Sequence, residues 1–374
     1  MATTSETTIF TVMSALAQQY NAINLAQGFP DFETDPQLAQ LLFEGSSQGW
    51  NQYAPMAGLA LLRENISAYL QHRFHIPADA LSEITVTPGA TYGIYTALAA
   101  CVQPGDEVVV LEPAYDSYVP NIRMLGAVPV TVPLMPGSFA PDFERIKSAI
   151  TPKTKAIIIN SPHNPTGAVW PQADYDVLAG IMRDTDIRII SDEVYEQLVF
   201  DGKTHFSVLQ HPELRARSFA VFSFGKVFMN TGWKVGYVVA PEQETRAFRR
   251  WHQYLSFSVN TPAQYALAHY LPLFDGAALC QKMQQLRDLF YELMQQTAFR
   301  MLPPAAGSFF QLASYEGLSE AGDFSFAEKL TQEKGVAAIP VNAFYQQPTG
   351  QKLLRFCFAK KEATLREAAL KMSK

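Results

Sequence analysis

The sequence predicts an α/β protein organised around a mostly parallel β-sheet. Between about residue 83 and residue 240, short runs rich in β-branched residues alternate with helical patterns. The recognisable runs are EITVTPG, DEVVVLEP, KAIIIN, IRIISD, FAVFSFG and WKVGYVVA. Each run is apolar throughout, which is typical of strands that a parallel sheet buries on both faces. Ligands of such sheets bind beyond the carboxyl ends of the strands, so the polar residues that follow each run are the first candidates for a site.

The C-terminal part of the chain has a different pattern. After YLPLFDGAA, at residues 270–278, a long Gln-rich helical segment leads to a strand pair, a helix near FSFAEKLTQE and the strand KLLRFCFA. This order of elements predicts an α+β unit. At 374 residues the chain also exceeds the usual size of a single domain. We therefore expect a large domain over residues 33–275 and a smaller domain formed by residues 1–32 and 276–374.

Composition and residue spacing exclude several classes of protein. Hydrophobic residues make up 48% of the chain and the formal charge is −6 without a clustered basic stretch, so we expect a globular protein with no nucleic-acid partner. The three cysteines lack CxxC spacing and the histidines form no HExxH pattern, which argues against disulfides and against a bound metal. No segment has the features of a signal peptide or the roughly 20 apolar residues of a membrane helix. We therefore expect a soluble cytoplasmic protein with no membrane partner.

The most informative segment is SFGKVFMNTGWKVGY, at residues 223–237. It places Ser223 and Lys226 in a loop directly after the strand FAVF, with Lys234 eight positions beyond Lys226. An ammonium beside an apolar strand end costs free energy unless it is paired or neutralised. A Schiff base removes that cost and uses the amine covalently. The alternative is a lysine whose side chain extends from the loop to solvent.

This segment resembles the cofactor-lysine segment of the class I aminotransferases, which use pyridoxal 5'-phosphate and have the fold called type I. The similarity extends over nearly the whole chain and is strongest to the methionine and kynurenine–glutamine aminotransferase branch, through TTIFTVMSALAQQ, QYAPM, FSVNTPAQ and GVAAIP. The resemblance implies a large domain with a mostly parallel seven-stranded sheet between helices, plus a smaller α+β domain. It also implies that Lys226 forms the Schiff base with the cofactor, and that Ser223 and Lys234 hold the phosphate.

Two other strand ends carry residues that match this family. Asp192 and Tyr195 follow the run IRIISD, and a carboxylate beside the pyridine nitrogen keeps the ring protonated so that it accepts electrons. The resemblance implies that Tyr195 donates to the ring oxygen. It also implies that Asn164, in the turn HNPTG, binds that oxygen and the substrate carboxylate. Considered alone, Asp192 is also a candidate helix N-cap and Asn-Pro a common start of a turn.

The segment TPGATYGIYTALAAC predicts a glycine turn that enters a helix, and the free amides at a helix N-terminus form an anion site. Gly89, Ala90 and Thr91 are therefore candidates for phosphate contacts. Tyr115, in EPAYDSY, matches the aromatic residue that stacks on the pyridine ring in this family. A core aromatic residue at a strand end is the alternative for Tyr115.

Arg355 lies among apolar neighbours in the predicted strand LLRFCFA. A buried arginine requires an anionic partner, and its planar fork suits a carboxylate. The resemblance implies that Arg355 binds the substrate α-carboxylate, and a structural salt bridge is the alternative. The resemblance further implies that Gly28 lines the substrate site. It assigns Tyr53 to the phosphate of the neighbouring subunit's cofactor, in a homodimer with shared active sites.

Together the residues and the resemblance imply ping-pong transamination between an L-amino acid and a 2-oxo acid, with Lys226, Asp192 and Tyr195 as catalytic residues. The branch points to methionine and other bulky apolar or aromatic amino acids. No second arginine is assignable to a side-chain carboxylate, which makes aspartate a poorer substrate. Two alternatives stay open, namely β-elimination at sulfur-containing amino acids by a C–S lyase, and a non-catalytic regulator that binds pyridoxal phosphate. Known regulators of this fold carry an added DNA-binding domain, for which this chain has neither the length nor the basic patch.

Overall fold

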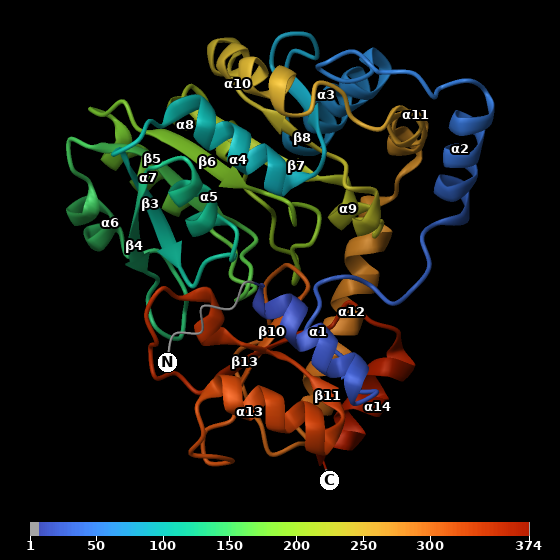
Figure 1. Cartoon of the computed structure of the whole chain (residues 1–374), viewed down its shortest axis with the longest axis vertical. Helices are drawn as coiled ribbons and strands as arrows, with labels where there is room; N and C mark the ends of the chain where they lie inside the picture. Colours follow the sequence, from blue (N-terminus) through green and yellow to red (C-terminus); the bar gives the residue numbers. More distant parts are fainter. Residues whose placement is uncertain (1–6, 374) are drawn as a thin grey trace.

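The computed structural model describes residues 7–373, and its largest element is a seven-stranded sheet (Figure 1). The strand order is β2-β8-β7-β6-β5-β3-β4, and all neighbours pair in parallel except β8, which is antiparallel to β2 and β7. The strands are β2 (Ile84–Thr87), β3 (Glu107–Glu112), β4 (Val128–Pro133), β5 (Thr154–Asn160), β6 (Arg188–Asp192), β7 (Ser218–Ser223) and β8 (Gly236–Val239). The α/β class and the mostly parallel seven-stranded sheet are therefore confirmed.

Strand β4 is the one member of this sheet that no run in the sequence indicated. Its sequence, VPVTVP, contains two prolines, and most of its side chains are partly or fully exposed. Proline cannot donate a hydrogen bond to a neighbouring strand, so it is confined largely to sheet edges. Because β4 is the edge strand beside β3, it lacks the continuous apolar run that marks the buried strands.

Helices cover both faces of the large sheet. Successive residues of a strand point to opposite faces, so Val108 and Val110 join one core cluster, whereas Val109 and Leu111 join another. The first core contains residues of α4 (Ala90–Cys101), α5 (Tyr118–Met124) and α10 (Glu242–Leu255). The second contains residues of α3 (Ala60–Phe74), α6 (Phe143–Ala149), α7 (Gln172–Met182), α8 (Pro212–Arg215) and α11 (Thr261–Tyr270), and α2 (Pro36–Ser47) packs on α11. Burial of both faces explains why the strands are apolar throughout.

The two ends of the chain build a second, smaller unit (Figure 1). Its antiparallel sheet has the order β12-β13-β10-β9, and β1 pairs in parallel with β11. Figure 1 shows α1, in blue, among the orange and red C-terminal elements. The strands are β1 (Ile23–Asn24), β9 (Arg300–Met301), β10 (Phe310–Ser314), β11 (Val336–Ala337), β12 (Ile339–Pro340) and β13 (Leu353–Cys357), and the helices are α1 (Ile9–Gln19), α12 (Gly276–Met294), α13 (Asp323–Lys329) and α14 (Glu362–Ser373). Described residues of both chain ends share one core, which also contains residues 194, 195, 198 and 200, and the domain boundaries 33–275 and 1–32 with 276–374 stay a prediction.

Two further properties concern the cysteines and the helices of the described residues. Cys101, Cys280 and Cys357 are all free thiols, and Cys357 is buried in β13. Within residues 7–373, every helix is too short or too polar to cross a membrane.

Candidate active site

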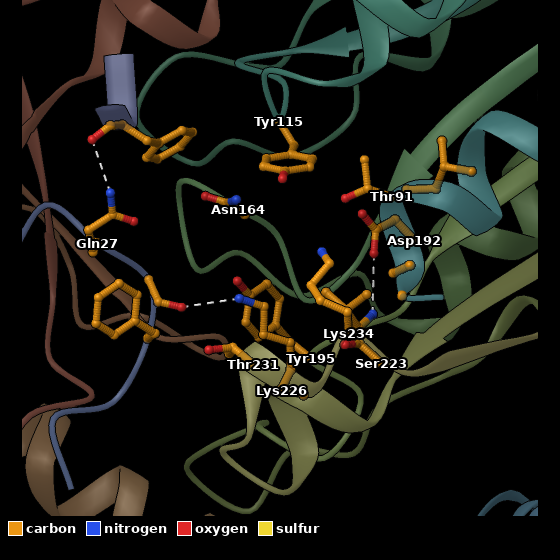
Figure 2. Close-up of a pocket in the computed structure, with 18 of the residues that line it drawn as sticks. Gln27, Thr91, Tyr115, Asn164, Asp192, Tyr195, Ser223, Lys226, Thr231 and Lys234 are labelled. Carbon is orange, nitrogen blue, oxygen red and sulfur yellow. Dashed lines mark hydrogen bonds between the residues drawn. The ribbon is translucent and has the colours of Figure 1, made fainter. Parts of the chain in front are cut away.

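A cavity of about 320 Å³ lies where the carboxyl ends of β5, β6 and β7 meet the smaller unit. Figure 2 shows its labelled side chains, with Tyr115 on one side of the view and Tyr195 and Lys226 on the other. All but one of the predicted site residues line it: Gly28, Gly89, Ala90, Thr91, Tyr115, Asn164, Asp192, Tyr195, Ser223, Lys226, Lys234 and Arg355. The exception is Tyr53, which lies outside this cavity, is 82% exposed and packs its ring edge against Phe257 at 5.6 Å.

Lys226 lies in α9 (Phe224–Val227), a single helical turn that begins where β7 ends. The prediction that Lys226 lies in a loop is therefore wrong. The turn closes through the amide of Phe228, which donates to the carbonyl of Phe224 at 2.7 Å. This turn directs the Lys226 side chain into the cavity, where it cannot be the solvent-exposed lysine considered as an alternative.

The amine of Lys226 is held among carbonyl and aromatic groups. Its Nζ donates to the carbonyl of Gly28 at 3.1 Å and lies 5.7 and 5.8 Å from the ring centroids of Tyr195 and Phe309. Burial, together with the nearby positive charges of Arg355 and Lys234, lowers the pKa of Lys226 to about 8 from an ordinary value of 10.5. The amine therefore loses its proton within reach of neutral pH, as a nucleophile and general base requires.

Asp192 ends β6 and presents a buried carboxylate to the cavity. Its Oδ2 accepts a hydrogen bond from the Tyr118 hydroxyl at 2.6 Å, and its Oδ1 accepts one from the amide of Val194 at 3.3 Å. Burial raises the pKa of Asp192 to about 6, and the hydrogen bond from Tyr118 opposes this rise. The Val194 bond is the local contact expected of a capping residue, but a turn follows in place of a helix.

Asn164 is fixed between two neighbouring strand ends. Its backbone amide donates to Oδ1 of Asn160, the last residue of β5, at 2.9 Å. Nδ2 of Asn160 in turn donates to the backbone carbonyl of Asp192 at 2.8 Å. The side chain of Asn164 faces the smaller unit, where its Oδ1 accepts from Nη1 of Arg355 at 2.8 Å. Asn164 thus belongs to a defined network and is more than the common turn residue considered as an alternative.

One end of the cavity has the features of an anion site. Gly89 precedes α4, and no side chain caps this helix, so its first amides are free to bind an anion. The φ angle of Gly89 is +87°, and a Cβ there would lie 3.4 Å from Cε and 3.5 Å from Nζ of Lys234. Ser223 and Thr91 line the same part of the cavity (Figure 2). Glycine thus leaves room for a group between the helix and the ammonium.

Arg355 is 1% exposed and lies at the opposite, smaller-unit side of the cavity. Besides its bond to Asn164, it donates from Nη2 to the carbonyl of Ala26 at 2.7 Å, and its guanidinium lies 3.9 Å from the ring centroid of Phe310. Its buried Nε has no hydrogen-bond partner. Within residues 7–373 no carboxylate forms an ion pair with Arg355, so the alternative prediction of a structural salt bridge is wrong. Burial lowers the pKa of Arg355 to about 10, which still leaves a cation at neutral pH.

Several residues of the site were not predicted. Asn160 and Tyr118 both form hydrogen bonds with Asp192. Asn160 ends an apolar run and Tyr118 follows one, so the expectation of site residues at strand ends could have identified both. The cavity residues of the smaller unit do not follow apolar strand runs, so this pattern could not have identified them. The unpredicted residues in the wall of the cavity are Phe10, Gln27, Phe29, Ile94, Val194, Thr231, Val235 and Phe310.

Comparisons with known proteins identify the family. The family described as aminotransferase class I and II matches residues 20–371. This chain belongs to the class I and II aminotransferases. Methionine aminotransferase of Escherichia coli strain K12 is 46% identical over 97% of this chain and 94% of its own length. Kynurenine–oxoglutarate transaminase 1 of Mus musculus is 33% identical over 94% of this chain and 91% of its own length. A solved structure from Escherichia coli with a methionine aminotransferase function has a TM-score of 0.95 at 45% identity, covering 100% of this chain and 99% of that one.

As a member of this family, the aminotransferase catalyses transamination and depends on pyridoxal phosphate. The resemblance noted in the sequence and the type I fold are thereby confirmed. Neither β-elimination nor a non-catalytic regulator is favoured, since these relatives are aminotransferases. The residues of the cavity fit the cofactor, because an uncapped helix and Lys234 suit a phosphate, Asp192 suits a ring nitrogen, and Lys226 is an amine with a lowered pKa.

Proposed function

We propose that the aminotransferase transfers the amino group of methionine, or of another bulky apolar or aromatic L-amino acid, to a 2-oxo acid. The proposal rests on the cations that residues 7–373 contribute to the cavity wall, namely Lys226, Lys234 and Arg355, because each has a role that leaves none of them for a side-chain carboxylate. Apolar side chains complete the wall, including Phe10, Phe29, Ile94 and Phe310. The action of the Escherichia coli relative on methionine supports this choice.

The residues at the strand ends divide the binding of the cofactor among them. When bound, pyridoxal phosphate supplies a carbonyl carbon that condenses with amines and a ring that accepts the electron pair left at the substrate Cα. Asp192 binds the ring nitrogen, and its carboxylate favours the protonated ring. Tyr195 and Asn164 would bind the ring oxygen, and Tyr115 would hold the face of the ring. The residues that hold the phosphate are Gly89, Ala90, Thr91, Ser223 and Lys234.

Lys226 has two roles, as the covalent anchor and as the base. With a substrate amine in the cavity, Nζ of Lys226 would serve as the base that takes the proton from the substrate Cα. The lowered pKa of Lys226 makes the neutral amine available for that step. The carbonyl of Gly28 holds the free amine in the cavity at 3.1 Å, so the base stays close to its substrate.

Arg355 and Asn164 bind the α-carboxylate of the substrate. The guanidinium is fixed by the carbonyl of Ala26 and by Asn164, and its buried Nε still lacks a partner. A carboxylate would satisfy that donor and compensate the buried charge. This contact would keep the substrate in the cavity that Lys226 also lines.

The aminotransferase acts as a homodimer with shared sites. Tyr53, Trp50, Tyr254 and Phe257 are exposed in a single chain, by 82%, 42%, 87% and 45%. Aromatic residues are enriched at subunit interfaces, and a second copy of this chain would bury them. In that dimer Tyr53 reaches the phosphate in the partner's site. A cytoplasmic location also stays a prediction.

A shared site is tested by mixing two inactive variants, Lys226→Ala and Tyr53→Ala. In a mixed dimer one site carries both changes and the other carries neither, so random exchange of subunits restores about a quarter of the wild-type activity. If each site is complete within one chain, mixing instead gives only the average of the two variants.

The substrate is tested by following the absorbance of bound pyridoxal phosphate while single amino acids are added. We expect methionine, phenylalanine and kynurenine to convert the cofactor to its amine form, and aspartate to react much more slowly. Equal rates with aspartate would contradict the proposed preference. Release of pyruvate and ammonia without an added 2-oxo acid would instead favour β-elimination.

A further inference from the structure

A buried tyrosine outside the cavity wall contacts the carboxylate of Asp192. Tyr118 is the first residue of α5, and it is 3% exposed. Its hydroxyl donates to Oδ2 of Asp192 at 2.6 Å, whereas the amide of Val194 reaches Oδ1 only at 3.3 Å. Within residues 7–373 no cation forms an ion pair with Asp192. The hydroxyl of Tyr118 is therefore the strongest direct support of this carboxylate, because a short hydrogen bond to a charged acceptor is stronger than a neutral one.

The same tyrosine also packs against a wall of the cavity. The ring centroids of Tyr118 and Tyr115 are 5.7 Å apart with an interplanar angle of 80°, an edge-to-face contact. Tyr115 lines the cavity and Tyr118 does not. One side chain at the start of α5 thus contacts both the residue assigned to the face of the cofactor ring and the residue assigned to its nitrogen.

The charges around Asp192 explain why this support matters. Burial raises the pKa of Asp192, and Glu193 raises it further, whereas the hydrogen bonds from Tyr118 and Val194 and the charge of Lys226 lower it. Burial also raises the pKa of Tyr118 well above its ordinary value, so its hydroxyl stays a donor at neutral pH. The other phenols near Asp192, Tyr115 and Tyr195, are kept neutral by burial as well.

We infer that Tyr118 is a positioning residue of transamination, which fixes the Asp192 carboxylate toward the ring nitrogen of the bound cofactor and supports its negative charge. This inference rests on the proposed role of Asp192. Without the hydroxyl, Oδ2 would be a buried acceptor without a partner, and the carboxylate would rotate or take up a proton. A neutral Asp192 no longer favours the protonated ring, and the ring then accepts electrons less readily.

The test is Tyr118→Phe, which removes the hydroxyl and keeps the ring against Tyr115. We expect the kcat for methionine to fall about 10-fold to 100-fold with little change in KM, because the lost hydrogen bond acts on a charged group that the substrate does not touch. We expect pyridoxal phosphate to bind about 10-fold more weakly. The pH midpoint of the absorbance change of bound cofactor should move upward, because loss of positive charge on the ring makes nearby groups hold their protons more tightly.

A matched control is Tyr315→Phe. Tyr315 is a fully buried tyrosine of the smaller unit whose hydroxyl donates to the carbonyl of Ala321 at 2.9 Å. It should lose a comparable amount of thermal stability without any change in kcat, cofactor affinity or absorbance midpoint. If Tyr118→Phe behaves like Tyr315→Phe in all three, the tyrosine is only structural and the inference is wrong.

A double-mutant cycle with Asp192→Asn separates this inference from the function on which it rests. If Tyr118 acts through the carboxylate, adding Tyr118→Phe to Asp192→Asn produces no further loss of cofactor affinity. An equal loss in both backgrounds would overturn the inference and leave transamination intact. A wild-type protein that fails to react with any amino acid would instead contradict the proposed function.

Discussion

The cavity has two buried cations, Lys226 at the end of β7 and Arg355 in β13. Burial disfavours the charge of both side chains, but only Arg355 keeps its charge well above neutral pH. Neither forms an ion pair with a carboxylate among residues 7–373. Burial lowers the pKa of Lys226 to about 8, so its charge is lost close to neutral pH. The pKa of Arg355 falls only to about 10, so its charge is kept. The large-domain strand end therefore provides a group that exchanges protons, and the small-domain strand provides a permanent anion receptor.

The difference comes from the groups themselves, because burial lowers both pKa values by a similar amount, from 10.5 to about 8 for Lys226 and from 12.5 to about 10 for Arg355. Lys226 has one hydrogen-bond partner, the carbonyl of Gly28, and two aromatic rings at more than 5 Å. Arg355 has a carbonyl, an amide oxygen and the ring of Phe310 at 3.9 Å, all of which stabilise a cation. A delocalised guanidinium also loses its proton far less readily than an ammonium. Under the proposed function both kinds of cation are needed, because Lys226 would exchange protons while Arg355 would hold the substrate carboxylate.

The largest expected effect follows from removing the exchanging cation. Lys226→Ala should lower kcat/KM for methionine by at least about 10⁴-fold, because both the covalent anchor and the base are lost. The measurement is single-turnover conversion of bound cofactor after mixing with methionine. Lys153→Ala, at an exposed lysine remote from the cavity, should leave the rate unchanged. Turnover of Lys226→Ala within 10-fold of wild type would refute its central role.

Replacing the permanent cation should have a smaller effect that depends on the substrate carboxylate. Arg355→Lys keeps the charge and removes the planar fork, so we expect kcat/KM for methionine to fall about 10²-fold. The matched amine without a carboxylate, 3-(methylthio)propylamine, should react equally poorly with both proteins.

Arg287→Lys is a suitable control for this change. Arg287 is 3% exposed and thus buried like Arg355, but it binds Asp201 and Asp288 outside the cavity. It should lose thermal stability and keep its kinetics. If Arg355→Lys also changes only stability, the carboxylate-binding role is wrong.

Lys226 and Arg355 also differ in how much of their role could be predicted from the sequence. Lys226, Asp192 and Asn164 follow apolar runs, so both their existence and their convergence at one sheet edge were predictable. Arg355 was recognisable as a buried cation, but its partners come from residues 26, 164 and 310, far apart in the chain. Periodicity carries no information on such contacts. Its role was therefore implied by family resemblance alone.

Strand β4, helix α9 and the contact of Tyr118 were not predicted, each for its own reason. The edge strand β4 has prolines and exposed side chains and so lacks the buried-strand pattern. The single turn of α9 is too short to produce a helical period, which is why Lys226 was assigned to a loop. Tyr118 stands three residues beyond Tyr115 in a recognised segment, but its bond to Asp192 joins positions 74 apart in the chain.

The proton exchange of Lys226 predicts how cofactor loading depends on pH. In the cofactor-free protein only the neutral amine attacks the carbonyl, so the rate of loading should rise about 10-fold per pH unit up to about pH 8 and then level off. An ordinary lysine, with a pKa of 10.5, would keep accelerating past pH 10. Stopped-flow absorbance after mixing with pyridoxal phosphate measures this rate. A rate that still rises above pH 9 would contradict the lowered pKa.

The smallest expected effect concerns the anion site, whose cation Lys234 is exposed and differs from both buried cations. Gly89→Ala places a Cβ 3.4 to 3.5 Å from the end of Lys234 and strains a backbone at φ +87°. Gly105→Ala is the matched control, since its φ is +90° and nothing lies within 4 Å of the added Cβ. Both should lose about 1–2 kcal/mol of stability, which thermal melting measures, because both place an L-residue at a positive φ angle. Only Gly89→Ala should also weaken the binding of pyridoxal phosphate, about 5-fold to 10-fold by fluorescence titration. Equal affinities in the two variants would mean that strain alone acts at Gly89, and the phosphate would then have to be bound elsewhere in the cavity.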